Sequence, residues 1–232
     1  MYQNESCLII MQIEIQKENL VNICRKLAEH GLVAATDGNV SARLYDGIVV
    51  VTPSGKSKSE VEVSDLIIVD LDGKIISGTS RPSTEFAMHG FIYRKRPDVG
   101  AVIHAHPVYA TAFAAARIPL DKLVFPEVIV AIGKIPLADY ATPSTQEVVK
   151  TIEPLVKDYD AILLANHGVV TYGASLEEAY NKMEKVEHTA KIAFVVRQLG
   201  GAKELTRDEI ERLASVSEKS YGKEIDIRKL FR

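Results

Sequence analysis

Val99-Gly-Ala-Val-Ile-His-Ala-His-Pro107 is the stretch that decides the fold of this chain and points to its chemistry. Its apolar residues predict a buried strand that ends at Pro107, and residues i and i+2 of a strand face the same side of a sheet. His104 and His106 therefore present two imidazoles together at a strand end, where they form a clamp for a transition metal. Taken alone, the pair is equally compatible with two partly buried, hydrogen-bonded histidines.

A third histidine has the same kind of setting. Ala161-Ile-Leu-Leu-Ala165 predicts another buried strand, which is followed at once by Asn166, His167 and Gly168. Three neutral imidazole nitrogens leave at least one open position on a zinc ion, as catalysis requires and a closed structural site does not. The three histidines together therefore favour one zinc ion (Zn2+) per chain.

Length and composition indicate a single globular domain over residues 1–232. The hydrophobic fraction of 47% and the charged fraction of 25% exclude a disordered chain. A net charge of −3 argues against a nucleic-acid partner. The presence of only two cysteines gives no disulfide framework and suits a reducing cytosol. No apolar run reaches the about 20 residues that a membrane span needs, and the start does not resemble a signal peptide, so we expect a cytoplasmic protein with no membrane partner.

Apolar spacing and turn signals predict an irregular alternation of helices and strands. Helices are expected over residues 14–30, 83–95 with Ser83 as N-cap, a segment ending near 116, 144–155, 175–199 with Ser175 and Glu178 as a capping box, and 207–217. Strands are expected over 47–51, 66–69, 74–76, 101–105, 127–131, 135–138, 161–165 and 169–172. This pattern predicts an α/β fold with a central, largely antiparallel sheet flanked by helices. Residues 1–13 are expected to form a loose extension and residues 218–232 a polar tail.

Three loops rich in glycine and short polar side chains are candidates for binding an anion. They are Thr36-Asp-Gly-Asn-Val-Ser41, Thr52-Pro-Ser-Gly-Lys56 and Ser80-Arg-Pro-Ser-Thr-Glu85. Their backbone N–H groups and hydroxyls can hold a phosphate, Lys56 adds a cation, and the last loop opens a helix whose dipole favours negative charge. Each loop alone fits plain turn chemistry, but three of them beside the histidine set predict a phosphate pocket.

Glu85 lies in the first turn of the helix that this last loop begins. One interpretation is an acidic residue that complements the helix dipole. The other is a carboxylate beside the metal and the phosphate, which acts as a fourth metal ligand or as a general base.

These residues, in this order, resemble the class II aldolase/adducin family. The resemblance runs from about residue 15 to Tyr221, and its most specific parts are Gly38-Asn39, Pro82-Ser-Thr-Glu85, His104-x-His106 and His167-Gly168. It implies a central antiparallel sheet in an α/β fold of three layers. It also implies a homotetramer with sites between the subunits.

The resemblance further implies a role for each matching residue. His104, His106 and His167 would hold zinc, and Glu85 would be the acid/base that also approaches the metal. Tyr221, in the polar tail, would reach a neighbouring subunit's site and protonate the aldehyde oxygen. The substrate phosphate would be bound by Gly38, Asn39, Ser54, Gly55, Ser83 and Thr84.

One segment departs from the family's aldolase pattern. Where that pattern has a tyrosine, this chain has Phe125-Pro-Glu-Val128 ahead of Ile135-Pro136, and Glu127 resembles an acid/base of methylthioribulose-phosphate dehydratases. The sequence thus predicts a zinc-dependent aldolase that cleaves a small ketose 1-phosphate to dihydroxyacetone phosphate and an aldehyde. The alternatives are a dehydratase or a pentulose-5-phosphate 4-epimerase on the same site. A non-catalytic adducin-like module is disfavoured by the intact histidines and Glu85 and by the lack of a long basic tail.

Overall fold

Strand β5 (Ala101–Ala105), which carries His104, lies inside an eight-stranded sheet between β1 and β8. The computed structural model describes the backbone of residues 2–222 and 224–231, and the side chains of residues 9–220, 222 and 224–231. The strand order is β4-β3-β2-β1-β5-β8-β7-β6, and every pairing is antiparallel except that of β6 with β7. The predicted central, largely antiparallel sheet is therefore confirmed.

The remaining strands are β1 (Asn39–Tyr45), β2 (Ile48–Val51), β3 (Ile67–Asp70), β4 (Ile75–Ser77), β6 (Leu137–Ala138), β7 (Ala161–Leu164) and β8 (Gly168–Gly173). The helices are α1 (Tyr2–Glu29), α2 (Phe86–Lys95), α3 (Val108–Ala115), α4 (Pro126–Ala131), α5 (Gln146–Val156), α6 (Leu176–Gln198), α7 (Arg207–Tyr221) and α8 (Ile227–Leu230), with a short 3-10 helix, η1, at Val63–Asp65.

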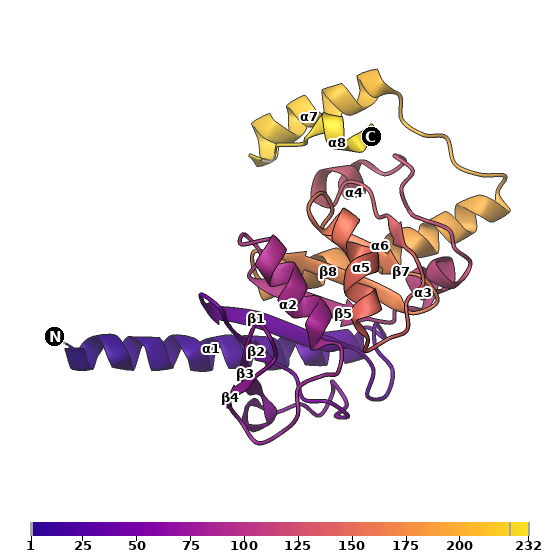
Figure 1. Ribbon diagram of the computed structural model, residues 1–232. Coiled ribbons are helices and arrows are strands. Elements are labelled where there is room, and N and C mark those ends of the chain that lie inside the picture. Colours follow the sequence, from indigo (N-terminus) through magenta and orange to yellow (C-terminus); the bar gives the residue numbers. More distant parts are fainter. Residues whose placement is uncertain (1, 223, 232) are drawn as a thin grey trace.

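Helices cover both faces of the sheet (Figure 1). One hydrophobic cluster joins α1, α3 and α6 to alternate strand residues such as Ala101 and Ile103 of β5. A second cluster joins α2 and α5 to the residues between them, such as Val102. Because side chains alternate along a strand, His104 lies on the same face as Val102, toward the layer that contains α2. The fold thus brings β5 and the start of α2 together.

Residues 126–131 form a helix, α4, although the sequence predicts a strand over 127–131. Pro126 is the first residue of α4, where its fixed φ and missing N–H are tolerated. Ile129 is buried in a small cluster with Ile210 of α7 and Leu230 of α8. The strand prediction is wrong because a short apolar run suits a buried helix as well as a strand.

Helix α2 begins at Phe86, with Glu85 rather than Ser83 as its N-cap. The preceding residues are held extended against the loop after β2, where Pro53 and Pro82 form an isolated β-bridge. The N–H of Ser54 also donates to the carbonyl of Arg81 at 2.9 Å. These long-range contacts keep the residues before Glu85 out of the helix and leave Glu85 as its N-cap.

Helix α1 starts at Tyr2, so residues 2–13 are helical and not the loose extension that the sequence predicts. Residues 1–29 contain neither glycine nor proline, so nothing in this sequence interrupts the helix. The N-terminal part of α1 projects beyond the rest of the molecule (Figure 1), and Ile9, Ile10 and Met11 on it are exposed. No helix among the described residues is long and apolar enough to cross a membrane.

The C-terminal helices α7 and α8 pack beside α4 (Figure 1). Helix α7 extends to Tyr221, four residues beyond the predicted end at 217, and Gly222 caps it in the left-handed conformation. Leu230 of α8 is buried, so part of the predicted polar tail packs against the body. The side chain of Tyr221 lies outside the described side chains.

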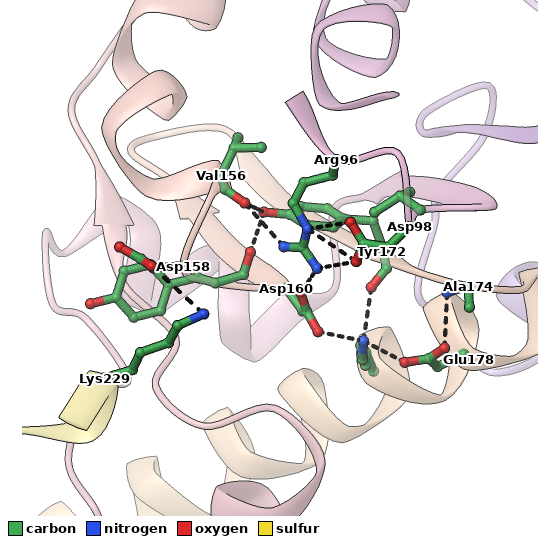
Figure 2. Close-up of polar contacts among 12 residues, drawn as sticks. Arg96, Asp98, Val156, Asp158, Asp160, Tyr172, Ala174, Glu178 and Lys229 are labelled. Atoms are coloured by element: carbon green, nitrogen blue, oxygen red, sulfur yellow. Dashed lines mark hydrogen bonds and ion pairs between the residues drawn. The ribbon is translucent and has the colours of Figure 1, made fainter. Parts of the chain in front are cut away.

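A charge network joins the segments before β5 and β7 to α6 (Figure 2). Asp160 accepts from Arg96 at 2.9 Å and from Lys182 at 2.8 Å. Lys182 also pairs with Glu178 at 2.7 Å. The carboxylate of Glu178 accepts from the N–H of Ala174 instead of closing the predicted capping box. Because these groups satisfy one another, the network is structural.

Candidate metal centre and active site

His104, His106 and His167 converge at one end of the sheet. In β5, His104 pairs with Asn39 of β1 and Val170 of β8. His106 follows the last residue of that strand, and His167 lies in the turn between β7 and β8. One ligand atom from each of the three imidazoles lies within 4.8 Å of the other two. The clustering that the sequence predicts is therefore present in the fold.

Hydrogen bonds fix which nitrogen of two imidazoles faces the centre. His104 donates from Nδ1 to the carbonyl of Val169 at 2.9 Å, and His106 donates from Nδ1 to Asp37 Oδ2 at 3.3 Å. Each Nε2 is then an unprotonated acceptor, and these two atoms lie 3.0 Å apart. Two lone pairs at that distance repel each other, and a cation bound by both removes the repulsion. The donor set therefore fits a transition metal.

His104 and His106 are held in the neutral state that metal binding requires. Burial lowers the pKa of His104 to about 3, against the attraction of Glu85. Burial also lowers the pKa of His106. Both residues therefore offer lone pairs at neutral pH.

The Glu85 carboxylate faces the same centre. Oε1 lies 3.1 Å from His167 Nε2, and Oε2 lies 3.4 Å from His104 Nε2. Asn39 Nδ2 donates to Oε2 at 2.9 Å. Burial alone would raise the pKa of Glu85, but the hydrogen bond from His167, the nearby imidazoles of His104 and His167, and the bond from Asn39 lower it to about 2. The side chain makes no capping bond to its own helix, so its surroundings favour a role at the histidines.

Two glycines make this close packing possible. A Cβ on Gly168 would lie 2.5 Å from both the carbonyl oxygen of Ala105 and the ring of His106. Gly38 has a φ of +76°, and a Cβ there would lie 2.8 Å from the carbonyl oxygen of His104. Both positions border the histidine strand, so glycine allows the neighbouring loops to approach it.

The three polar loops meet beside this centre. The loop after β2 joins the segment before α2 through the Pro53–Pro82 bridge, and Thr52 Oγ1 accepts from the N–H of Val40 at 3.1 Å, next to Asn39. The structure thus brings together the six residues predicted to bind phosphate: Gly38, Asn39, Ser54, Gly55, Ser83 and Thr84.

The side chains of this set differ in what they already contact. Thr84 shares a hydrogen bond of 2.7 Å with Ser144, and Ser54 is exposed. Asn39 Oδ1 is buried without a partner among the described residues. Lys56, which the sequence offers as the pocket's cation, is instead bonded to Asp65 at 2.5 Å.

Of the other two predicted catalytic residues, only Glu127 has a described side chain, and it is not assembled with the histidines. Glu127 is exposed on the first turn of α4, and no hydrogen bond or ion pair links its described side chain to the centre. The position of the Tyr221 side chain lies outside the described residues. Their predicted roles therefore remain proposals.

Two further residues support the site: sequence reasoning missed Asp37, and it predicts a packing role for His89. Asp37 holds His106, and its only sequence signal is its position in the glycine loop before Gly38. Beneath Glu85, the buried His89 shares a hydrogen bond of 2.7 Å with Ser41. Burial lowers the pKa of His89 to about 4, so this imidazole is neutral and supports the helix from within the core.

Comparison with known proteins agrees with this geometry. Residues 18–194 match the family described as Class II Aldolase and Adducin N-terminal domain. The 5-deoxy-D-ribulose 1-phosphate aldolase of Bacillus thuringiensis serovar kurstaki is 32% identical over 215 residues, covering 92% of this chain and 100% of that protein. The L-fuculose phosphate aldolase of Methanococcus maripaludis is 37% identical over 180 residues, covering 77% of this chain and 96% of that protein.

A further relative and a solved structure complete the comparison. A 3-oxo-tetronate 4-phosphate decarboxylase of Pectobacterium atrosepticum is 35% identical over 205 residues, covering 85% of this chain and 92% of that protein. A solved L-fuculose 1-phosphate aldolase matches with a TM-score of 0.80 and 34% identity, covering 86% of this chain and 94% of that chain. The chain belongs to the class II aldolase and adducin family, and like these relatives it is a lyase of the metal-dependent class.

Proposed function

We propose that this protein is a zinc-dependent aldolase that cleaves a small ketose 1-phosphate, of the L-fuculose 1-phosphate type, to dihydroxyacetone phosphate and an aldehyde. The observation that carries the proposal is the Glu85 carboxylate, which lies 3.1 Å from His167 and 3.4 Å from His104 within the imidazole cluster. An acid/base group beside three metal-binding nitrogens is what carbon–carbon cleavage next to a carbonyl requires. One aldolase relative is named for 5-deoxy-D-ribulose 1-phosphate and the other for L-fuculose phosphate, which supports this substrate class.

His104, His106 and His167 would hold the zinc. When bound, the metal supplies Lewis-acid stabilisation of negative charge on the substrate's oxygens. Glu85 is ionised at neutral pH, since its pKa is lowered to about 2. Its carboxylate would carry the C3 proton to and from the three-carbon fragment, while Asn39 holds it in place through the bond of 2.9 Å. Asp37 would keep the His106 ring oriented.

The polar loops would bind the substrate phosphate. Gly38 and Asn39, Ser54 and Gly55, and Ser83 and Thr84 come from three segments that the fold joins beside Glu85. A phosphate held there fixes the reacting carbons relative to the carboxylate and removes an entropic part of the barrier.

The proton on the departing aldehyde's oxygen needs a second group. We propose Tyr221 of a neighbouring subunit in a homotetramer as the group that takes up this proton on cleavage and returns it in the reverse reaction, with Glu127 as the alternative. Both residues belong to the C-terminal half of the chain: Tyr221 ends α7, and Glu127 is exposed on α4. An exposed carboxylate is open to a second subunit.

A decarboxylase is the second candidate function, because one relative at 35% identity is named as a 3-oxo-tetronate 4-phosphate decarboxylase. Both reactions leave negative charge on a carbon next to a carbonyl, so the same centre suits both. Product analysis separates them. A panel of ketose 1-phosphates is scored for dihydroxyacetone phosphate, and a panel of 3-oxo acid 4-phosphates for carbon dioxide. The aldolase proposal expects cleavage in the first panel, with turnover lost on chelation, and activity in the second panel alone would overturn it.

A further inference from the structure

Lys58 is a buried lysine outside the histidine centre. Its side chain is 1% exposed, and its ammonium donates to the carbonyl oxygens of Thr36 at 3.1 Å and Lys56 at 2.8 Å. Burial lowers the pKa of Lys58, while the charges of Cys24 and Asp37 oppose the shift. An ammonium has three N–H donors, so these two bonds leave one unused.

The other buried lysine of the described chain shows the contrast. Lys182 is 5% exposed, and it pairs with Asp160 at 2.8 Å and with Glu178 at 2.7 Å. Among the described side chains, no carboxylate forms an ion pair with Lys58, whose partners are neutral carbonyl groups. A buried charge without a directly bonded counter-charge is costly to keep in a core. Lys58 therefore marks a position suited to an anion.

The position of Lys58 connects two of the polar loops. Thr36 lies two residues before Gly38-Asn39, and Lys56 directly follows Ser54-Gly55. Through its two hydrogen bonds, the Lys58 ammonium holds both loops from the inside of the molecule. Its positive charge thus lies beneath the two segments proposed to bind phosphate.

The exposed neighbour of Lys58 does not replace it. Lys56 Nζ is bonded to Asp65 Oδ2 at 2.5 Å, so its charge is already balanced by a carboxylate. The bonds from Lys58 are both to backbone, so its own charge is left for an outside group.

We infer that Lys58 supplies the buried positive charge of the phosphate site, and that a phosphate monoester bound across the two loops is its counter-anion. The inference rests on the proposed function, which places the phosphate at these loops. Lys58 is a positioning residue: it attracts the dianion from beneath the backbone and keeps the two loops in register, without touching the reacting carbons.

Calorimetric titration of the metal-loaded protein with inorganic phosphate tests this role. The wild type is compared with Lys58→Met, which keeps an unbranched apolar stem and removes the charge, and with Lys56→Met, which removes the same formal charge two residues away. We expect Lys58→Met to weaken phosphate binding by on the order of 10- to 100-fold, because a bond or attraction to a charged group is lost. Lys56→Met should change the affinity less than about threefold, because it breaks an exposed ion pair.

Thermal unfolding with and without phosphate separates this role from a purely structural one. Ligand that binds only the folded state raises the melting temperature. We expect Lys58→Met to lose most of the rise that phosphate gives, whatever its melting temperature without phosphate, since the loss of two loop hydrogen bonds alone would lower both melting temperatures equally. A variant that melts lower in both buffers yet keeps the full rise would overturn the inference. Lys58→Gln, which retains an amide donor, serves if the methionine variant does not fold.

The titration also distinguishes the two levels of the proposal. Wild-type protein that binds no phosphate would overturn the phosphate site itself and this inference with it. Wild-type protein that binds phosphate as tightly as both Lys58 variants would overturn the role of Lys58 alone and leave the proposed function standing.

Discussion

Glu85 stands at the N-terminus of α2, where a carboxylate ordinarily complements the helix dipole. Here the side chain makes no capping bond, and it lies 3.1 Å from His167 and 2.9 Å from Asn39. The helix start places the carboxylate, while the imidazoles and the asparagine orient it. The sequence leaves open whether Glu85 has a dipole role or a catalytic one, and its contacts favour the catalytic role.

Glu85→Gln should keep the fold and lose most of the turnover. An amide of the same shape cannot carry a proton, and a general acid/base contributes on the order of 10²- to 10⁴-fold to rate. Turnover with the best substrate of the panel and metal content are measured together. Glu177→Gln is the matched control, because Glu177 is an exposed first-turn glutamate of α6. Wild-type turnover in Glu85→Gln would return this residue to a dipole role.

Glu127→Gln tests the second acid/base group. If Glu127 acts on the aldehyde oxygen, the variant should slow the chemical step with little change in substrate affinity, as expected of a group that acts in the transition state. Single-turnover rates and substrate binding are compared with those of the wild type. An unchanged rate removes Glu127 from the mechanism and leaves Tyr221 as the proposed acid/base group.

At the scale of elements, the sequence predicts best where local signals are strong. The apolar runs give β5 and β7 within a residue of their observed bounds, and Ser175 is confirmed as the N-cap of α6. The strand predicted over 127–131 is wrong because a short apolar helix and a strand can have the same sequence pattern. The predicted start of α2 is wrong because the Pro53–Pro82 bridge holds the preceding residues extended. No local sequence signal indicates a contact between residues so far apart in the chain.

The candidate site follows the same rule. The histidines and the polar loops are visible in sequence because their residue types are unusual at strand ends and turns. Their partners are not visible: Asp37 reaches His106 across 69 positions, and Lys56 is bonded to Asp65 instead of serving the pocket. Tertiary pairing decides which charge is available, and pattern alone does not encode it.

Asp160→Asn should destabilise the fold without affecting the metal centre. Asp160 joins the segment before β5 to α6 through Arg96 and Lys182, whose side chains are 18% and 6% exposed. Its own side chain is 30% exposed, so we expect a loss of about 1–3 kcal/mol, less than for a fully buried pair. Chemical unfolding measures the loss, and metal content is measured alongside.

Asp72→Asn is the control for that experiment. Asp72 pairs with Arg94 but is 88% exposed, and such surface pairs contribute about 0–1 kcal/mol. Equal stability of Asp160→Asn and Asp72→Asn would contradict a structural role for the network.

At the scale of the whole molecule, the proposal requires a site shared between subunits. Glu85 lies in the central part of one chain, and Tyr221 ends a helix near the C-terminus. Mixed oligomers of Glu85→Gln and Tyr221→Phe should regain activity, because some sites then combine an intact Glu85 with an intact Tyr221. Turnover is measured after subunit exchange has been verified by mass spectrometry, with each variant exchanged against itself as control. Persistent inactivity of the mixed oligomers would contradict a shared site.

The central claim is that His104, His106 and His167 hold one catalytic zinc ion per chain. Elemental analysis of the purified protein, beside a His106→Ala variant and a His188→Ala control, tests it most directly. His188 lies on α6, outside the three-histidine cluster. We expect one zinc per chain in the wild type and in His188→Ala, and a clear loss in His106→Ala, which keeps only two of the three nitrogens. Equal metal content in all three proteins would contradict the assignment.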